Sequence, residues 1–162
     1  MLGLLGVVAS ATVAAPVLAG IADKPLPLLN GGKSQHVYSV PGVIKLGVFE
    51  TLFMCTSAET EETIRVGVEV FDDAGGNPAN DVGAGEGAID VGPGETVTIA
   101  TGNTAAFVED TIIPLNVNMS GGSARIVSTS KKIICTAMLV DLIGAPPGSM
   151  IWRGTCARHA RC

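Results

Sequence analysis

The chain has 162 residues, which suits one domain, and its length requires no second one. Hydrophobic residues make up 47% of it, aromatic residues only 4%, and 21 positions are glycine, so we expect a β-rich fold with a small aliphatic core and many turns. The net charge is −5, and the segment from Thr56 to Glu95 contains ten acidic residues but a single basic residue, Arg65. Such a region repels nucleic acid and anionic lipid, so we expect no nucleic-acid partner.

The N-terminal segment 1–22 is apolar, with no charged side chain from Leu2 to Ala22. One interpretation is a secretory signal peptide whose small-x-small cleavage site is Val17-Leu18-Ala19, which gives a mature start near Gly20. The others are a retained membrane anchor or assembly segment, diluted by glycine, serine and proline, and a buried strand. We expect membrane contact only through an uncleaved N-terminus.

A linker is expected over 23–36, because Pro25 and Pro27 oppose a helix and Asn30-Gly31-Gly32 is a turn signal. The folded body is then predicted to span 37–145. Its first element is a single long strand from Val43 to Cys55, which is apolar and rich in β-branched and aromatic residues.

Period-2 alternation predicts the next strand over Ile64 to Phe71, with the aliphatic face, which begins with Ile64 and Val66, toward the core. Residues 72–94 are predicted to form a long loop with one edge strand near Ala88-Ile89. Further strands are expected over 95–101, 107–117, 123–128 and 132–142, with Ser120-Gly121-Gly122 as a turn. About seven short strands without a helical window predict an all-β, immunoglobulin-like antiparallel sandwich.

Two short motifs support a resemblance. The run Gly92-Pro93-Gly94-Glu95-Thr96-Val97-Thr98-Ile99 resembles the Pro-Gly-x-Thr strand start of bacterial immunoglobulin-like and fibronectin-like extracellular modules. The segment from Val66 to Gly76 resembles their valine-rich strand that ends in an Asp-x-x-Gly turn. The body, about 43–142, is similar to small secreted bacterial proteins, which implies this fold and a secreted setting but transfers no site residue. The tryptophan of antibody-type cores is missing, since Trp152 follows the last strand.

Cys55 and Cys135 lie 80 residues apart in strand-like segments, so we expect them to form an inter-strand disulfide with Cα atoms about 4.4–6.8 Å apart. Buried free thiols are the alternative. A bridge implies an oxidising compartment, which agrees with export. Closing this loop stabilises the fold by roughly 4 kcal/mol on the chain-entropy estimate.

The basic C-terminal tail 146–162 contains Cys156, His159 and Cys162 at spacings of three. We expect a small disulfide loop between the two cysteines. A metal site, a bridge to another chain and the absence of any role are the alternatives, since structural zinc needs a fourth ligand and the neighbouring arginines repel a cation.

The acidic loop has the oxygen-rich composition that calcium requires, although its spacing is not that of an EF-hand. The calcium candidates are Asp72, Asp73, Asn77 and Asp81, and a merely solvated loop is the alternative. Catalysis is not expected, because the only histidines, His36 and His159, lie in the predicted linker and tail, and no nucleotide or zinc-protease motif is present.

The sequence thus predicts a secreted or cell-envelope structural or interaction protein, without enzymatic activity and without a cofactor. Its partner is an envelope protein of unknown identity, or a second copy that is reached through the terminal segments. The alternative is an extracellular module that uses the acidic loop 72–95 to bind calcium or a glycan.

Overall fold

The structure is a computed structural model that describes residues 21, 24–104, 107–141, 151–152 and 155–156. The described residues contain only strands, turns and irregular segments, with no helix. The twelve strands are β1 Leu28–Leu29, β2 Gly32–Lys33, β3 Gln35–Leu46, β4 Phe49–Ser57, β5 Ile64–Phe71, β6 Ala88–Val91, β7 Thr96–Ala100, β8 Thr111–Ile112, β9 Met119–Ser128, β10 Ile133–Asp141, β11 Ile151–Trp152 and β12 Thr155–Cys156.

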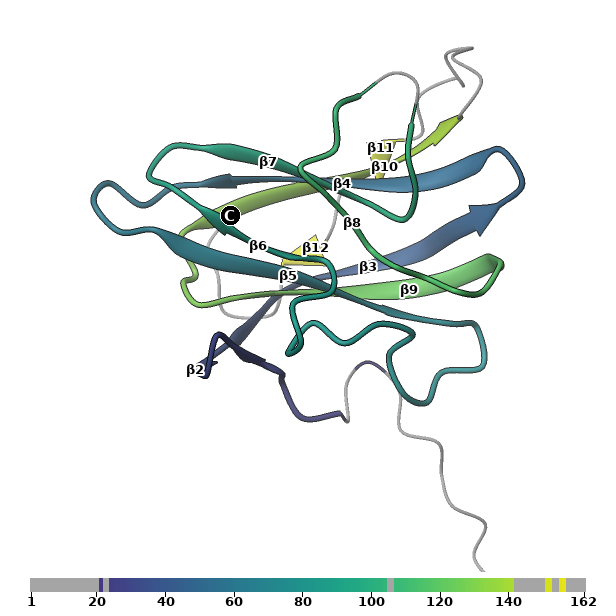
Figure 1. Cartoon of the computed structure of the whole chain (residues 1–162), viewed down its shortest axis with the longest axis horizontal. Coiled ribbons are helices and arrows are strands. Elements are labelled where there is room, and N and C mark those ends of the chain that lie inside the picture. Colours follow the sequence, from purple (N-terminus) through teal and green to yellow (C-terminus); the bar gives the residue numbers. More distant parts are fainter. Residues whose placement is uncertain (1–20, 22–23, 105–106, 142–150, 153–154, 157–162) are drawn as a thin grey trace, which may run out of the picture.

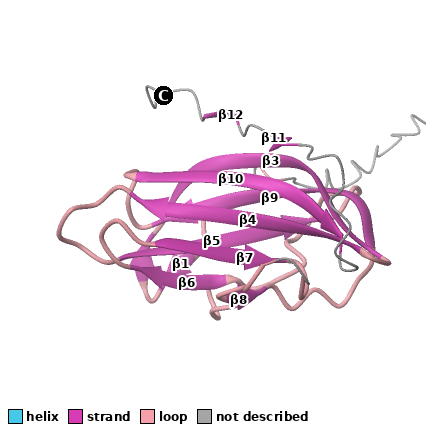
Figure 2. Cartoon of the chain, turned by 90° about the horizontal axis from the view of Figure 1, so that it is seen from above, coloured by secondary structure: helices cyan, strands magenta, loops and turns pink. Residues whose placement is uncertain are grey.

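The longer strands form two layers (Figure 1). One, named here the β5 layer, has the order β6-β5-β9-β3; the other, the β4 layer, contains β10, β4, β7 and β8. The layers are joined where β3 pairs with β4 at only two positions, Lys45↔Glu50 and Leu46↔Phe49. Beyond these pairs β7 takes the place of β3 beside β4. Figure 2 shows β3 and β10 along one side of the sandwich, with β6, β7 and β8 toward the other.

The main core lies between the layers. Val66, Val68 and Val70 of β5 are fully buried and pack with Phe53 of β4 and Ile99 of β7. This cluster is almost entirely aliphatic, as the composition indicates. The predicted all-β sandwich is therefore confirmed, and seven of the described strands have four or more residues.

The predicted strand from Val43 to Cys55 is wrong as a single element. It is the hairpin of β3 and β4, which turns at Gly47, where φ is +63°. A positive φ is costly for residues other than glycine, so Gly47 permits a reversal inside an otherwise apolar run. Beyond the turn, the Thr51 hydroxyl accepts from the N–H of Ile44 and donates to its carbonyl oxygen. These side-chain bonds take the place of backbone ladder bonds where the two strands separate.

Two further expectations are corrected near β9. The segment 107–117 contains only the two-residue strand β8, which runs parallel to β7. The expected turn at Ser120-Gly121-Gly122 lies inside β9, where the register with β3 shifts. A Cβ on Gly122 would lie 2.4 Å from the carbonyl oxygen of Phe71, so this glycine allows a close approach of backbones instead of a chain reversal.

Three other predicted strands agree with the structure. The alternating segment Ile64–Phe71 is β5, the edge strand near Ala88 is β6, and the last predicted strand is β10.

The predicted linker is corrected. Its residues 24–36 pack against the fold, with the hairpin β1–β2 and a buried Leu29, and β3 already starts at Gln35. Proline excludes a helix there but does not prevent an extended segment from packing on a sheet.

Candidate functional site

The outer face of the β5 layer carries the most buried charges that the structure describes. Arg125 of β9 is 2% exposed and lies opposite Glu69 of β5 in the strand register. Its Nε donates to Glu69 Oε2 at 2.7 Å, and its Nη2 lies 2.6 Å from the same oxygen. The guanidinium carbon also lies 5.6 Å from the ring centre of Phe71, within the range of a cation–π contact.

The Arg125 guanidinium also binds the segment that precedes β1. Nη1 donates to the carbonyl oxygens of Ile21 and Lys24 at 3.1 and 2.9 Å, and Nη2 donates to that of Pro25 at 3.1 Å. One buried side chain thus fastens an extended N-terminal segment across the sheet. We call residues 24–29 the strap.

A small second core holds the far end of the strap. Leu29 packs with Val82 and Val127, and all three are buried. Gly67 of β5 lies beneath them, and a Cβ there would come within 2.3 Å of Val82 Cγ1. Both faces of β5 are therefore covered, whereas its alternating sequence predicts one solvated face.

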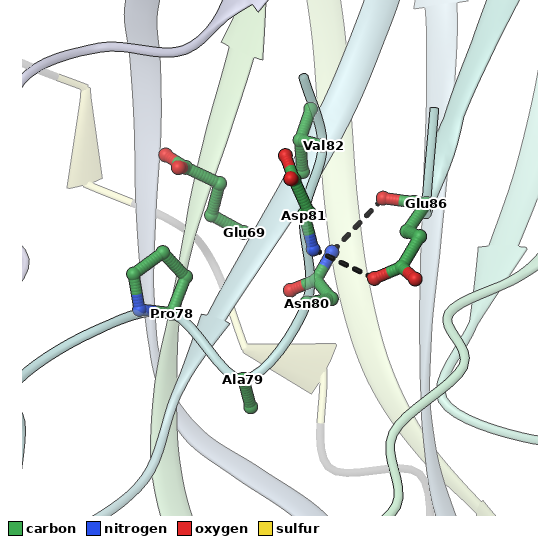
Figure 3. Close-up of a pocket in the computed structure, with 7 residues that line it drawn as sticks. All are labelled: Glu69, Pro78, Ala79, Asn80, Asp81, Val82 and Glu86. Atoms are coloured by element: carbon green, nitrogen blue, oxygen red, sulfur yellow. Dashed lines mark hydrogen bonds between the residues drawn. The ribbon is translucent and has the colours of Figure 1, made fainter. Parts of the chain in front are cut away.

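Beside this ion pair the outer face has an open depression of about 420 Å³, bordered by the carboxylates of Glu69, Asp81 and Glu86 (Figure 3). Burial raises the pKa of Glu69 above its ordinary value of 4.5, and Arg125 opposes that shift. The backbone N–H of Asp81 donates to Glu86 Oε2 at 2.7 Å, and Asp81 Oδ1 accepts from the N–H of Ala84 at 3.0 Å. These two carboxylates order the loop around the depression.

Asn80 also lines the depression, and its buried side chain bonds to the edge of β5. Its Oδ1 accepts from the N–H of Val70 at 2.9 Å, and its Nδ2 donates to the carbonyl oxygens of Val68 and Glu86 at 2.9 and 3.0 Å. An amide presents both a donor and an acceptor, so it can stand in for a strand residue beyond the end of β6. Asn80 therefore acts as a structural residue.

The calcium candidates do not converge. Asp72 and Asp73 are exposed at the end of β5, Asn77 Oδ1 accepts from Lys24 Nζ at 2.7 Å, and Asp81 caps its own loop. Within the described part of the chain, no group of three or more histidine, cysteine, aspartate or glutamate side chains is arranged to hold a metal ion.

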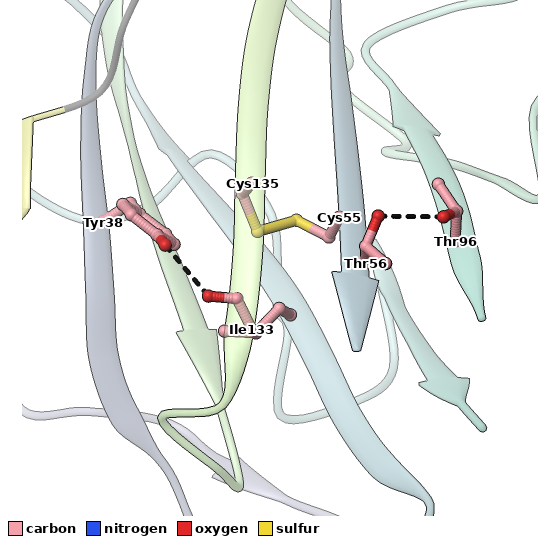
Figure 4. Close-up of a disulfide and its surroundings, with 6 residues drawn as sticks. All are labelled: Tyr38, Cys55, Thr56, Thr96, Ile133 and Cys135. Carbon is pink, nitrogen blue, oxygen red and sulfur yellow. Dashed lines mark hydrogen bonds between the residues drawn. A yellow bond between two sulfur atoms is a disulfide. The ribbon is translucent and has the colours of Figure 1, made fainter. Parts of the chain in front are cut away.

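The Cys55–Cys135 bridge is confirmed, and it joins β4 to β10 within one layer (Figure 4). The Cα atoms lie 4.2 Å apart, just below the expected range, because the two residues face each other directly in the strand register. Such a distance is close to that of a non-hydrogen-bonded antiparallel pair, about 4.5 Å. Antibody domains instead place their bridge between two sheets.

His36 lies in β3 and not in a linker. Its Nε2 is 3.0 Å from the Tyr38 carbonyl oxygen and 3.0 Å from Ser39 Oγ, so it takes part in a local backbone contact. Burial lowers the pKa of His36 below its ordinary value of 6.5. Of the tail residues, Cys156 is the second residue of β12, while His159 and Cys162 and their predicted disulfide or metal role lie outside the described residues, as does most of the segment 1–22.

No family model, no curated protein and no solved structure matches this chain. In the portion that the structure describes, no helix has the length and apolar character needed to cross a bilayer.

The site residues that the sequence did not single out are Arg125, Glu69 and Asn80. An arginine inside the apolar run Ala124–Val127 was the available signal, because arginine is almost never buried without a partner.

Proposed function

We propose that this chain is a secreted or cell-envelope structural or interaction protein without catalytic activity. The observation that carries the proposal is that its buried polar side chains hold other parts of the chain in place. Arg125, paired with Glu69, binds the strap, and Asn80 completes the edge of β5. Groups that an enzyme would aim at a substrate here bind backbone and loop atoms.

The disulfide supports the proposed compartment. Bridges between cysteines persist in oxidising environments such as the periplasm and the cell surface. The contacts of Arg125 are compatible with export, since it binds the carbonyl oxygens of Ile21, Lys24 and Pro25. Cleavage near Gly20 would therefore leave these contacts intact, which fits the expectation of a signal peptide that ends at Ala19.

A ligand-binding module for calcium or a glycan is the second candidate, and the open depression beside Glu69 is the observation in its favour. The two candidates differ in one measurement. A ligand that binds only the native state raises stability by RT ln(1 + [L]/Kd), so millimolar calcium should raise the melting temperature of a calcium module. We expect no change, and a calcium-dependent rise of several degrees would favour the module.

The proposed interaction role is tested by covalent cross-linking in the native envelope, followed by affinity isolation of the chain. We expect cross-linked species that contain a second copy of the chain or an envelope protein. Recovery of the chain only as an uncross-linked monomer from a reducing cytoplasm would contradict the proposal.

A further inference from the structure

The strap is attached to the sheet through one charged side chain, Arg125. Its Nε donates to Glu69 Oε2 at 2.7 Å. Its two terminal nitrogens donate to three backbone carbonyl oxygens, which belong to Ile21, Lys24 and Pro25. The cation that holds the strap therefore has Glu69 as its counter-ion, so the protonation state of this carboxyl group bears on the attachment.

Both members of this ion pair are shielded from water although they lie on the outer face of the sheet. The side chains of Arg125 and Glu69 are only 2% and 6% exposed. The strap and the loop residues 78–82 lie over this face, and Leu29 anchors the end of the strap in the second core. Detachment of the strap therefore brings water to the ion pair.

Charged groups from three elements surround Glu69. Arg125 of β9 lowers its pKa, and Asp81 of the loop after β5 raises it. Glu86 borders the same depression (Figure 3), and Lys24 of the strap donates to an amide oxygen of that loop. Burial is the largest influence, and it raises the pKa of Glu69 above 4.5 despite Arg125. The ionised carboxylate is therefore the form that gains more from water when the strap detaches.

The depression gives protons a route to Glu69 while the strap is in place. It is open to solvent, has a volume of about 420 Å³ and is bordered by the carboxylates of Glu69, Asp81 and Glu86. Glu69 can therefore titrate without unfolding of the chain. Its protonation state, and with it the attachment of the strap, follows the pH of the solvent.

We propose that the strap is a pH-dependent latch, which protonation of Glu69 holds on the sheet and ionisation of Glu69 allows to detach. The stabilisation that protonation contributes is fully present below pH 4.5, the ordinary value for a hydrated glutamate, and is lost as the pH rises through the folded pKa. Detachment uncovers Arg125 and the apolar side chains of Val82 and Val127. This inference goes beyond the proposed function, since it makes the outer face of the β5 layer a surface whose exposure is regulated.

Proteolysis of the full-length chain under native conditions tests the latch. Thermolysin cleaves on the amino side of leucine, so cleavage within β1, between Leu28 and Leu29, reports detachment of the strap. The cleavage rate is divided by that of a free peptide of residues 24–34 at the same pH, and this ratio follows the population of the detached strap. From about pH 5 to about pH 7 the ratio should rise at least about threefold.

Three variants assign the rise to one group. Glu69→Gln removes the titrating group but keeps the size of the side chain, so its ratio should not change with pH. Glu61→Gln is the matched control, because Glu61 is an exposed glutamate between β4 and β5, and it should keep the rise. His36→Gln removes a second titrating group close to Arg125, whose positive form repels Arg125 and loosens the strap at acid pH, so this variant should also keep the rise.

A second measurement does not require Glu69→Gln to fold. Because attachment of the strap and ionisation of Glu69 affect each other equally, the pKa of Glu69 must depend on the strap. NMR titration of this carboxyl group should give a pKa above 4.5 in the wild type and one closer to 4.5 in Leu29→Ser, which loses the apolar anchor. A wild-type ratio that is constant or falls with pH, a rise retained in Glu69→Gln, or equal pKa values in the two chains would overturn the latch. None of these results bears on export or on the disulfide, so the proposed function would stand.

Discussion

Replacing Arg125 by methionine tests whether one buried side chain fastens the strap. The substitution keeps an unbranched side chain but removes the partner of Glu69 and the donor to three carbonyl oxygens. Removing one member of a buried ion pair typically costs about 3–5 kcal/mol, because the other charge remains buried. Glu69 borders the open depression and can regain some water, so we expect about 3 kcal/mol.

Urea unfolding, followed by circular dichroism, gives the free energy directly. The double variant Arg125→Met with Glu69→Leu leaves no isolated charge, so it should recover about 2 kcal/mol of the loss seen in the single variant. Lys132→Met is the matched control, because its ion pair with Glu59 is exposed on the lysine side and should matter little. Limited proteolysis at Lys24 should accelerate in both variants that lack Arg125, because each loses the donor to the strap carbonyls, and not in Lys132→Met.

The pH dependence adds a second readout. Burial raises the pKa of Glu69 in the folded state, so protonation favours the fold at acid pH, and this contribution is lost as the pH rises through the folded pKa. Without Arg125 that pKa rises further, so the deficit of Arg125→Met should shrink as the pH falls toward 4.5, the unfolded value. A single variant within 1 kcal/mol of wild type (about a fivefold change in the folding equilibrium), or a double variant less stable than the single, would refute the strap account.

Three further predictions concern other parts of the fold. Replacing Cys55 and Cys135 by alanine should lower the free energy of unfolding by about 2–4 kcal/mol, and equal urea midpoints with and without reductant would contradict this. Asn80→Ala leaves Val70 N–H and Val68 C=O without their amide partner and should cost about 2 kcal/mol, whereas Asn77→Ala, at an exposed contact, should cost little by the same urea assay. Burial lowers the pKa of His36 in the folded state, so the contribution of neutral His36 to stability is complete above pH 6.5 and declines as the pH falls toward the folded pKa. His36→Gln should therefore reduce the slope of the free energy of unfolding against pH below 6.5, and an unchanged slope would count against this prediction.

Local alternation was enough to predict β5 and the face that it turns to the main core. The aliphatic positions of β5 repeat every two residues, and the structure buries them between the layers. Cys55 and Cys135 were found by their place in strand-like segments, and they face each other in the register. These features depend on period and on residue type, which the sequence states directly.

The strap and its ion pair depend on contacts that local patterns do not contain. Arg125 binds residues about a hundred positions away in the chain, and Gly67 is covered by Leu29 and Val82 from two other segments. The alternation of β5 predicted a solvated outer face because nothing local indicates what covers it. Gly47 was missed for a related reason, since a single glycine in an apolar run does not distinguish a turn from a close packing site.

The central claim is that this chain is an exported structural protein stabilised by the Cys55–Cys135 disulfide. Non-reducing peptide mapping of the chain recovered from its native host tests it most directly. The account predicts a linked peptide pair that contains Cys55 and Cys135, together with an N-terminal peptide that begins near Gly20. Recovery of both cysteines as free thiols, in a chain that still starts at Met1 in the soluble cytoplasmic fraction, would contradict it.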